Sequence, residues 1–117
     1  MKKNGKTILV VDDSSLIVER LSDMLNELRH VKQVLAASDY REAHKLLAEE
    51  AIDVALLDIN LPGKNGIELL KMIVKQHPGI RVVMISNAAD DMYRKLCKKE
   101  GASYFIDNRR NLSVYRK

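Results

Sequence analysis

The sequence predicts an α/β fold in which helices cover both faces of a parallel sheet. Three observations lead to this prediction. Short apolar runs alternate with longer segments of helical periodicity along the chain. The connections between successive runs are long enough to return the chain in the same direction, so the strands pair in parallel. Several runs are apolar throughout, which is typical of strands buried on both faces.

Five short, mainly apolar segments are predicted to be strands. They cover residues 7–11, 31–37, 54–57, 80–85 and 102–106. Five strands with helical crossovers fit the smaller doubly wound fold, in which the strand order is 2-1-3-4-5. In that order strands 1 and 3 are neighbours, and ligands bind beyond their carboxyl ends.

Four segments between these strands carry apolar residues at helical spacing. In the first, one apolar face is predicted from Leu16, Ile17, Leu21, Met24, Leu25 and Leu28. Asp39 with Glu42, and Asn65 with Glu68, form patterns typical of the capping box that begins a helix. These two pairs predict the starts of the second and third helices.

The last part of the chain predicts one complete helix and one fragment. The fourth helix is expected to run from Asp90 to about Glu100, and Gly101 is expected to end it. Residues 111–117 would form a fifth helix of fewer than two turns. A helix of that length is marginal by itself.

Composition narrows the class of protein. The 117 residues predict a single domain, residues 1–117, and one cysteine, Cys97, excludes an internal disulfide framework. No apolar run is long enough to span a membrane, and no signal peptide is recognised, so a cytoplasmic location is expected. The net charge of +4 is spread along the chain without a nucleic-acid-binding motif, so no direct nucleic-acid contact is expected.

Three carboxylates occupy the predicted ligand-binding edge. Asp12 and Asp13 follow the first strand, and Asp58 follows the third. Like charges this close disfavour joint ionisation, and a hard divalent cation relieves the conflict. Oxygen ligands of this kind suit Mg²⁺. The alternative is that each aspartate caps the helix that follows, which does not account for three acids converging from two strands.

A phosphoryl-transfer site is the chemical interpretation of this cluster. Ser86 follows the fourth strand, where its hydroxyl could bond an anion held above the metal. The carboxylate of Asp58 could then act as a nucleophile and form an aspartyl phosphate. An ordinary strand-end serine is the alternative for Ser86 taken by itself.

Together, these motifs resemble the receiver domain of two-component response regulators. The matching segments are ILVVDD at 8–13, LLDINLPGKNG at 56–66, MIS at 84–86 and GASYF at 101–105. The resemblance extends from about Thr7 to Asn108. It implies the CheY-like variant of the flavodoxin-like fold, here with a truncated fifth helix.

The resemblance implies a role for each site residue. Asp58 would be the phosphoacceptor. Mg²⁺ would be held by Asp13, Asp58 and the backbone carbonyl of Asn60, with Asp12 acting partly through water. The phosphoryl donor would be a sensor histidine kinase or a histidine phosphotransfer protein. The chain would be an enzyme only in assisting its own phosphorylation and dephosphorylation.

The resemblance also implies how the signal would leave the domain. Ser86 would contact the phosphoryl group and move toward it, and Phe105 would be the switch aromatic that turns inward in response. A downstream protein would then dock on the face around the fourth helix and fifth strand. Phe105 as an ordinary aromatic of the last strand is the alternative.

Two features depart from the family pattern. Asn108 occupies the place of the usual lysine, and the loss of that charged hydrogen bond costs about 1.5–3 kcal/mol of phosphoryl-state stabilisation. Arg109 or Lys64 could supply the missing cation. The short fifth helix would leave apolar surface on the first helix and on strands 1, 4 and 5, which favours self-association or a covering partner.

Three other functions are less well supported by the sequence. A pseudo-receiver that docks partners without regulated phosphorylation is favoured by Asn108 and the short fifth helix. The complete set of aspartates and Ser86 oppose it. A Mg²⁺-dependent phosphatase acting on an outside substrate needs a second acid as proton donor, and Asn60 stands at that position. A dinucleotide-binding domain lacks the glycines it requires after the first strand.

Overall fold

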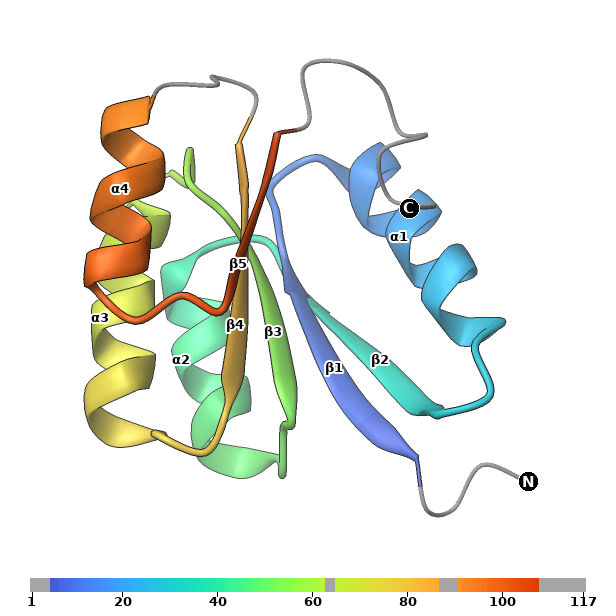
Figure 1. Cartoon of the computed structure of the whole chain (residues 1–117). Helices are drawn as coiled ribbons and strands as arrows, with labels where there is room; N and C mark the ends of the chain where they lie inside the picture. Colours follow the sequence, from blue (N-terminus) through green and yellow to red (C-terminus); the bar gives the residue numbers. More distant parts are fainter. Residues whose placement is uncertain (1–4, 63–64, 87–90, 108–117) are drawn as a thin grey trace.

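The computed structural model describes residues 5–62, 65–86 and 91–107 of the chain. Five strands and four helices alternate along these residues (Figure 1). The elements are β1 (Lys6–Val11), α1 (Ser15–Asn26), β2 (Val31–Ala37), α2 (Tyr40–Glu49), β3 (Val54–Asp58), α3 (Gly66–Gln76), β4 (Arg81–Ser86), α4 (Asp91–Lys99) and β5 (Tyr104–Asp107). The predicted α/β fold class is therefore confirmed.

The strands form one parallel sheet in the order β2-β1-β3-β4-β5, as predicted. β1 lies between β2 and β3, and Val10 of β1 is in register with Leu56 of β3. Asp58, the last residue of β3, is in register with Ile85 of β4. The carboxyl ends of these three central strands therefore meet at one edge of the sheet.

Helices lie on both faces of the sheet. Figure 1 shows α2, α3 and α4 on one face and α1 on the other. Residues of β1 alternate between the two faces, because successive side chains of a strand point in opposite directions. Leu9 and Val11 enter the core under α2 and α3, whereas Ile8 and Val10 enter the core under α1.

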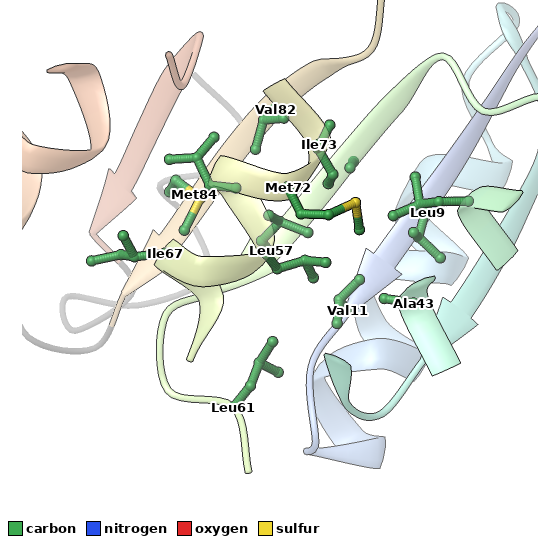
Figure 2. Close-up of a cluster of buried hydrophobic side chains, with 14 of the residues drawn as sticks. Leu9, Val11, Ala43, Leu57, Leu61, Ile67, Met72, Ile73, Val82 and Met84 are labelled. Atoms are coloured by element: carbon green, nitrogen blue, oxygen red, sulfur yellow. The ribbon is translucent and has the colours of Figure 1, made fainter. Parts of the chain in front are cut away.

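The core beneath α2, α3 and α4 is the larger of the two. Figure 2 shows Leu57 and Met84 of the sheet packed near Ile67, Met72 and other side chains of α3. Leu9, Leu57 and Met84 are completely buried. This core holds β1, β3 and β4 together at the edge where the aspartates lie.

The helix starts agree with the sequence, but their hydrogen bonds differ from a complete capping box. Asp39 accepts a hydrogen bond from the Glu42 N–H at 2.8 Å, as predicted. The Glu42 carboxylate instead accepts from the Ser38 N–H at 2.7 Å, one residue before the cap. Asn65 accepts from the Glu68 N–H at 3.1 Å, while the Glu68 carboxylate lies 3.6 Å from Lys71.

The end of α4 is formed as predicted. Gly101 has a φ of +107°, a conformation that side chains with a Cβ rarely adopt. The N–H of Ala102 donates to the Cys97 carbonyl and the N–H of Gly101 donates to the Lys98 carbonyl. These two bonds form the glycine-based motif that satisfies the last carbonyls of a helix.

Several predicted details are corrected by the structure. The last strand begins at Tyr104 rather than at residue 102, and Leu16 and Leu28 are more than half exposed. Leu28 lies beyond the end of α1, and Leu16 lies in the first turn of that helix. The predicted start at Asp90, the fifth-helix fragment and the residues Lys64, Asn108 and Arg109 lie outside the described residues.

An apolar groove of about 670 Å³ runs between α1 and the sheet. The described residues that line it include Leu21, Leu25 and Leu28 near α1, and Ile8, Val83 and Ile106 of the strands. Apolar surface at α1 and at strands 1, 4 and 5 was predicted, and the groove also includes β3. Within the described part of the chain, no helix combines the length and apolar character needed to cross a membrane.

Candidate functional site

The candidate site lies at the carboxyl ends of β1 and β3. Asp12 and Asp13 follow β1, and Asp58 ends β3. One carboxylate oxygen from each of the three residues lies within 4.8 Å of the other two. A hollow of about 360 Å³ opens above them, and Asn60 also lines it. The three acids predicted to converge are therefore together, and Asn60 lies with them.

Backbone N–H groups orient two of the three carboxylates. Asp12 accepts a hydrogen bond from the Ser14 N–H at 2.9 Å. Asp58 accepts from the Asn60 N–H at 3.1 Å. Each bond joins a carboxylate to the turn two residues further along, a geometry that aspartate readily adopts after a strand. The turns thus hold these side chains at the sheet edge before any ligand arrives.

Gly66, the first residue of α3, allows the loop after β3 to fold tightly. Its N–H donates to the Ile59 carbonyl at 2.8 Å. A Cβ at this position would overlap the backbone carbonyl of Asp58. Only glycine therefore permits this close approach, which determines where the Asp58 backbone lies.

Burial raises the pKa of two of the carboxylates, those of Asp58 and Asp12. Asp58 is half-buried, and desolvation is the main reason that its pKa rises to about 6. The Asn60 N–H opposes this rise in pKa, while the charges of Asp12 and Asp13 add to it. The pKa of Asp12 is also raised, first by burial and then by the charge of Asp13, against the hydrogen bond from Ser14.

The three carboxylates form a suitable site for a divalent cation. Burial and the neighbouring negative charges disfavour the ionised state of Asp12 and Asp58, and a bound cation offsets both effects. All the donor atoms are oxygens, which suits Mg²⁺ and similar hard cations. The partly exposed position leaves room for water or a substrate oxygen to complete the coordination.

Ser86 and Phe105 are not among the described residues that line the acidic hollow. Ser86 ends β4 and is almost completely buried, one residue after Ile85, the register partner of Asp58. Ile85, rather than Ser86, is among the described residues that line the hollow. Phe105 lies on β5, half-buried, and the guanidinium carbon of Arg94 is 4.9 Å from its ring centre. The structure thus groups the aspartates with Asn60 and places Phe105 with α4.

Two contributors to the site were missed by the sequence analysis. Ser14 is the N-cap of α1, where its side chain accepts from the Ile17 N–H, and its own N–H orients Asp12. Its position before an apolar helical run is a capping signal that was available. Ile17 also lines the hollow, but nothing local in the sequence distinguishes it from a core residue.

Comparison with known proteins agrees with this geometry. The family model of the response regulator receiver domain matches residues 8–113. The transcriptional regulatory protein MalR of Bacillus subtilis is 33% identical over 85% of this chain and 43% of that protein. A protein-glutamate methylesterase/protein-glutamine glutaminase of Thermotoga maritima is 37% identical over 92% of this chain and 28% of that protein. The chain thus spans less than half the length of either relative.

Solved structures share the same fold. The response regulator domain of Thermotoga maritima CheB superposes with a TM-score of 0.84 at 32% identity, covering 96% of this chain and 87% of that one. CheY in the CheX-CheY-BeF3-Mg complex of Borrelia burgdorferi superposes with a TM-score of 0.83 at 30% identity, covering 95% and 82%. The chain belongs to the response regulator receiver domains of two-component systems.

Proposed function

We propose that this chain accepts a phosphoryl group on Asp58 from a phosphorylated histidine and passes the signal on by protein docking. The observation that carries the proposal is the approach of the Asp12, Asp13 and Asp58 carboxylate oxygens to within 4.8 Å at the edge of the sheet. A kinase or phosphotransfer protein of the same signalling system would supply the phosphohistidine. The solved complex that contains BeF3 and Mg with a similar domain supports this assignment.

The proposed reaction is a nucleophilic displacement at phosphorus. One Asp58 carboxylate oxygen forms a bond to phosphorus as the bond between phosphorus and the donor imidazole nitrogen breaks. The electron pair of that bond returns to the imidazole nitrogen, which takes up a proton from solvent. The product is an aspartyl phosphate, and the Asn60 N–H bond to Asp58 keeps the carboxylate oriented for attack.

We assign Mg²⁺ binding to Asp12, Asp13, Asp58 and the backbone carbonyl of Asn60. When bound there, Mg²⁺ would neutralise negative charge on the phosphoryl oxygens. The chain's own contribution is to position the Asp58 carboxylate through the hydrogen bond from the Asn60 N–H. Since burial raises its pKa to about 6, a neighbouring positive charge would favour the nucleophilic form.

Propagation of the signal is proposed to pass through Ser86 and Phe105. Ser86 shares the sheet edge with Asp58, and Phe105 contacts α4 through Arg94. The neutral Asn108 would weaken stabilisation of the phosphoryl group, unless Arg109 or Lys64 supplies the charge. Output would come from a downstream protein that docks on α4 and β5.

We also propose that two copies of the chain associate through the groove beside α1. The groove is apolar, and Leu28 at its margin is 52% exposed. Exposed apolar surface of this kind favours association, because contact removes it from water.

The experiment that tests phosphorylation is intact-mass analysis after incubation with acetyl phosphate and Mg²⁺. We expect a single phosphoryl adduct in the wild-type chain and none in the Asp58→Asn variant. Asp53→Asn is the matched control, because Asp53 is a half-buried aspartate at the opposite end of β3. Absence of the adduct, with Mg²⁺ binding intact, would identify a docking module without regulated phosphorylation.

A further inference from the structure

Helix α4 has an excess of positive charge that the described residues do not neutralise. Within the nine residues of this helix, one side chain, Asp91, is acidic and four are basic. The four basic side chains are all exposed: Arg94, Lys95, Lys98 and Lys99. Across the described residues, the one ion pair within 4.0 Å joins Glu68 and Lys71 on α3.

The stability of the helix explains only part of this charge. Lys98 and Lys99 lie in the last turn, where positive charge interacts favourably with the helix dipole. Arg94 and Lys95 lie before that turn. Arg94 is four residues from Lys98, and Lys95 is four residues from Lys99, so the two like charges of each pair repel each other on one side of the helix. These like-charge pairs therefore lower the stability of the helix. Binding of a negatively charged partner would account for their presence.

Two of these cations face a hollow of about 340 Å³ between α4 and β5. The hollow is lined by Arg94, Lys98, Ala102, Ser103, Tyr104 and Phe105. The guanidinium of Arg94 lies over the Phe105 ring, with its central carbon 4.9 Å from the ring centre. This cation–π contact restrains the arginine before any partner arrives, which lowers the entropy lost on binding.

Exposed hydrophobic side chains surround the same region. Of the described chain's six large hydrophobic residues that are exposed, three belong to α4 and β5: Met92 at 75%, Tyr93 at 40% and Tyr104 at 64%. Tyrosine and arginine are enriched among the residues that dominate binding energy at protein interfaces. Charge and hydrophobic contact are therefore available together.

We propose that the hollow between α4 and β5 binds an acidic segment of a partner protein. An Asp or Glu carboxylate of that segment would pair with Arg94 and Lys98, and a neighbouring apolar side chain would pack on Tyr104. This inference rests on the proposed function, in which α4 and β5 form the docking face, and it specifies the chemistry of the partner. Since an arginine fork bonds a carboxylate with two parallel hydrogen bonds, the acidic residue would provide specificity.

The observations favour a peptide over a nucleic acid. The hollow has the dimensions of a side-chain pocket, whereas nucleic-acid binding depends on many cations distributed along a line of phosphates. Interfaces with DNA are also more polar than interfaces with proteins. Here Tyr104 lines the same hollow as Arg94 and Lys98, as expected for a protein interface.

Selection from a library of random dodecapeptides displayed on phage would test this inference. The wild-type chain is the target, and the Arg94→Glu, Lys98→Glu double variant is used for counter-selection. We expect enriched peptides to contain Asp or Glu next to an apolar residue. Enrichment of peptides without acidic residues, or no enrichment, would overturn the inference.

Binding of the most enriched peptide is then measured by fluorescence anisotropy. We expect at least tenfold weaker binding to the Arg94→Glu, Lys98→Glu variant and weaker binding at higher salt. The matched control is the Lys45→Glu, Lys75→Glu variant, which reverses two exposed cations on α2 and α3 and should bind like wild type. Equal loss of peptide affinity in both variants would show general charge attraction. Tighter binding of a labelled 20-base-pair DNA duplex than of the peptide would show that a peptide is the wrong class of partner. Either result overturns the inference.

Fluorescence anisotropy with the Asp58→Asn variant, compared with the intact-mass result for wild type, separates the two proposals. Peptide binding that persists while no phosphoryl adduct forms in wild type would contradict the proposed phosphorylation alone. A phosphoryl adduct in wild type without selection of acidic peptides, in either the phosphorylated or the unphosphorylated chain, would contradict the partner assignment alone.

Discussion

The backbone of Gly66 packs directly against the carbonyl of Asp58, with no room for a Cβ between them. This contact joins the first turn of α3 to the end of β3. It determines where the Asp58 backbone lies relative to Asp12 and Asp13, and therefore determines the shape of the acidic site.

Gly66→Ala should destabilise the fold and impair the site. The added Cβ would force the Asp58 backbone to move, and steric overpacking of this kind costs about 1–3 kcal/mol. We expect urea unfolding to show that loss and the acetyl phosphate reaction to slow markedly. Gly79→Ala is the control, since a Cβ there meets no atom within 4 Å. Equal effects of the two variants would contradict this account.

Without Mg²⁺, Asp58 should make the fold less stable as pH rises. Its pKa is about 3.8 in the unfolded chain and about 6 in the folded protein, so the folded state binds more protons between these values. Ionisation across this range therefore removes stability, by about 1–2 kcal/mol after allowing for solvent screening at this half-buried group.

The measurement is urea unfolding of wild type and Asp58→Asn at pH 4, 5, 6 and 7 in the presence of EDTA. The free energy of unfolding of wild type minus that of Asp58→Asn should fall as the pH is raised from 4 to 7. A difference that stays constant, or that rises with pH, would show that Asp58 is not protonated preferentially in the folded state.

Mg²⁺ should stabilise the wild-type chain at pH 7, because it binds the folded arrangement of carboxylates. Each tenfold increase in free Mg²⁺ above its dissociation constant should add about 1.4 kcal/mol to the free energy of unfolding. Asp13→Asn should abolish most of this gain, whereas Glu19→Gln, at an exposed residue of α1, should retain it. Calorimetric titration with Mg²⁺ provides a direct check. Unchanged binding in Asp13→Asn would exclude Asp13 from the metal site.

Leu28→Gln should reduce self-association. Leu28 is 52% exposed and lines the apolar groove, so a polar side chain there should weaken contact between copies without removing core packing. Leu16→Gln is a close control, since Leu16 is 56% exposed and is not among the described residues that line the groove. Sedimentation velocity over a range of concentrations distinguishes the variants. A wild-type chain that stays monomeric throughout would refute association through this surface.

Much of the fold could be predicted because its signals are local. Apolar runs predicted the strands, and Asp39, Asn65 and Gly101 predicted helix ends that the structure contains. In a complete capping box the N-cap N–H also donates to the glutamate carboxylate, and neither of the two predicted boxes forms this second bond. Glu42 bonds to Ser38 and Glu68 lies beside Lys71, and such choices between nearby partners depend on the folded arrangement.

The sequence by itself determined the α/β class, the strand order and the placement of Asp12, Asp13 and Asp58 at strand ends. These features follow from periodicity and from the position of a residue within its own element. Only the tertiary structure decided how close the carboxylates lie, how far burial raises the pKa of Asp58, and that Arg94 lies over Phe105. Distances and desolvation depend on atoms that are far apart along the chain, so local patterns do not specify them.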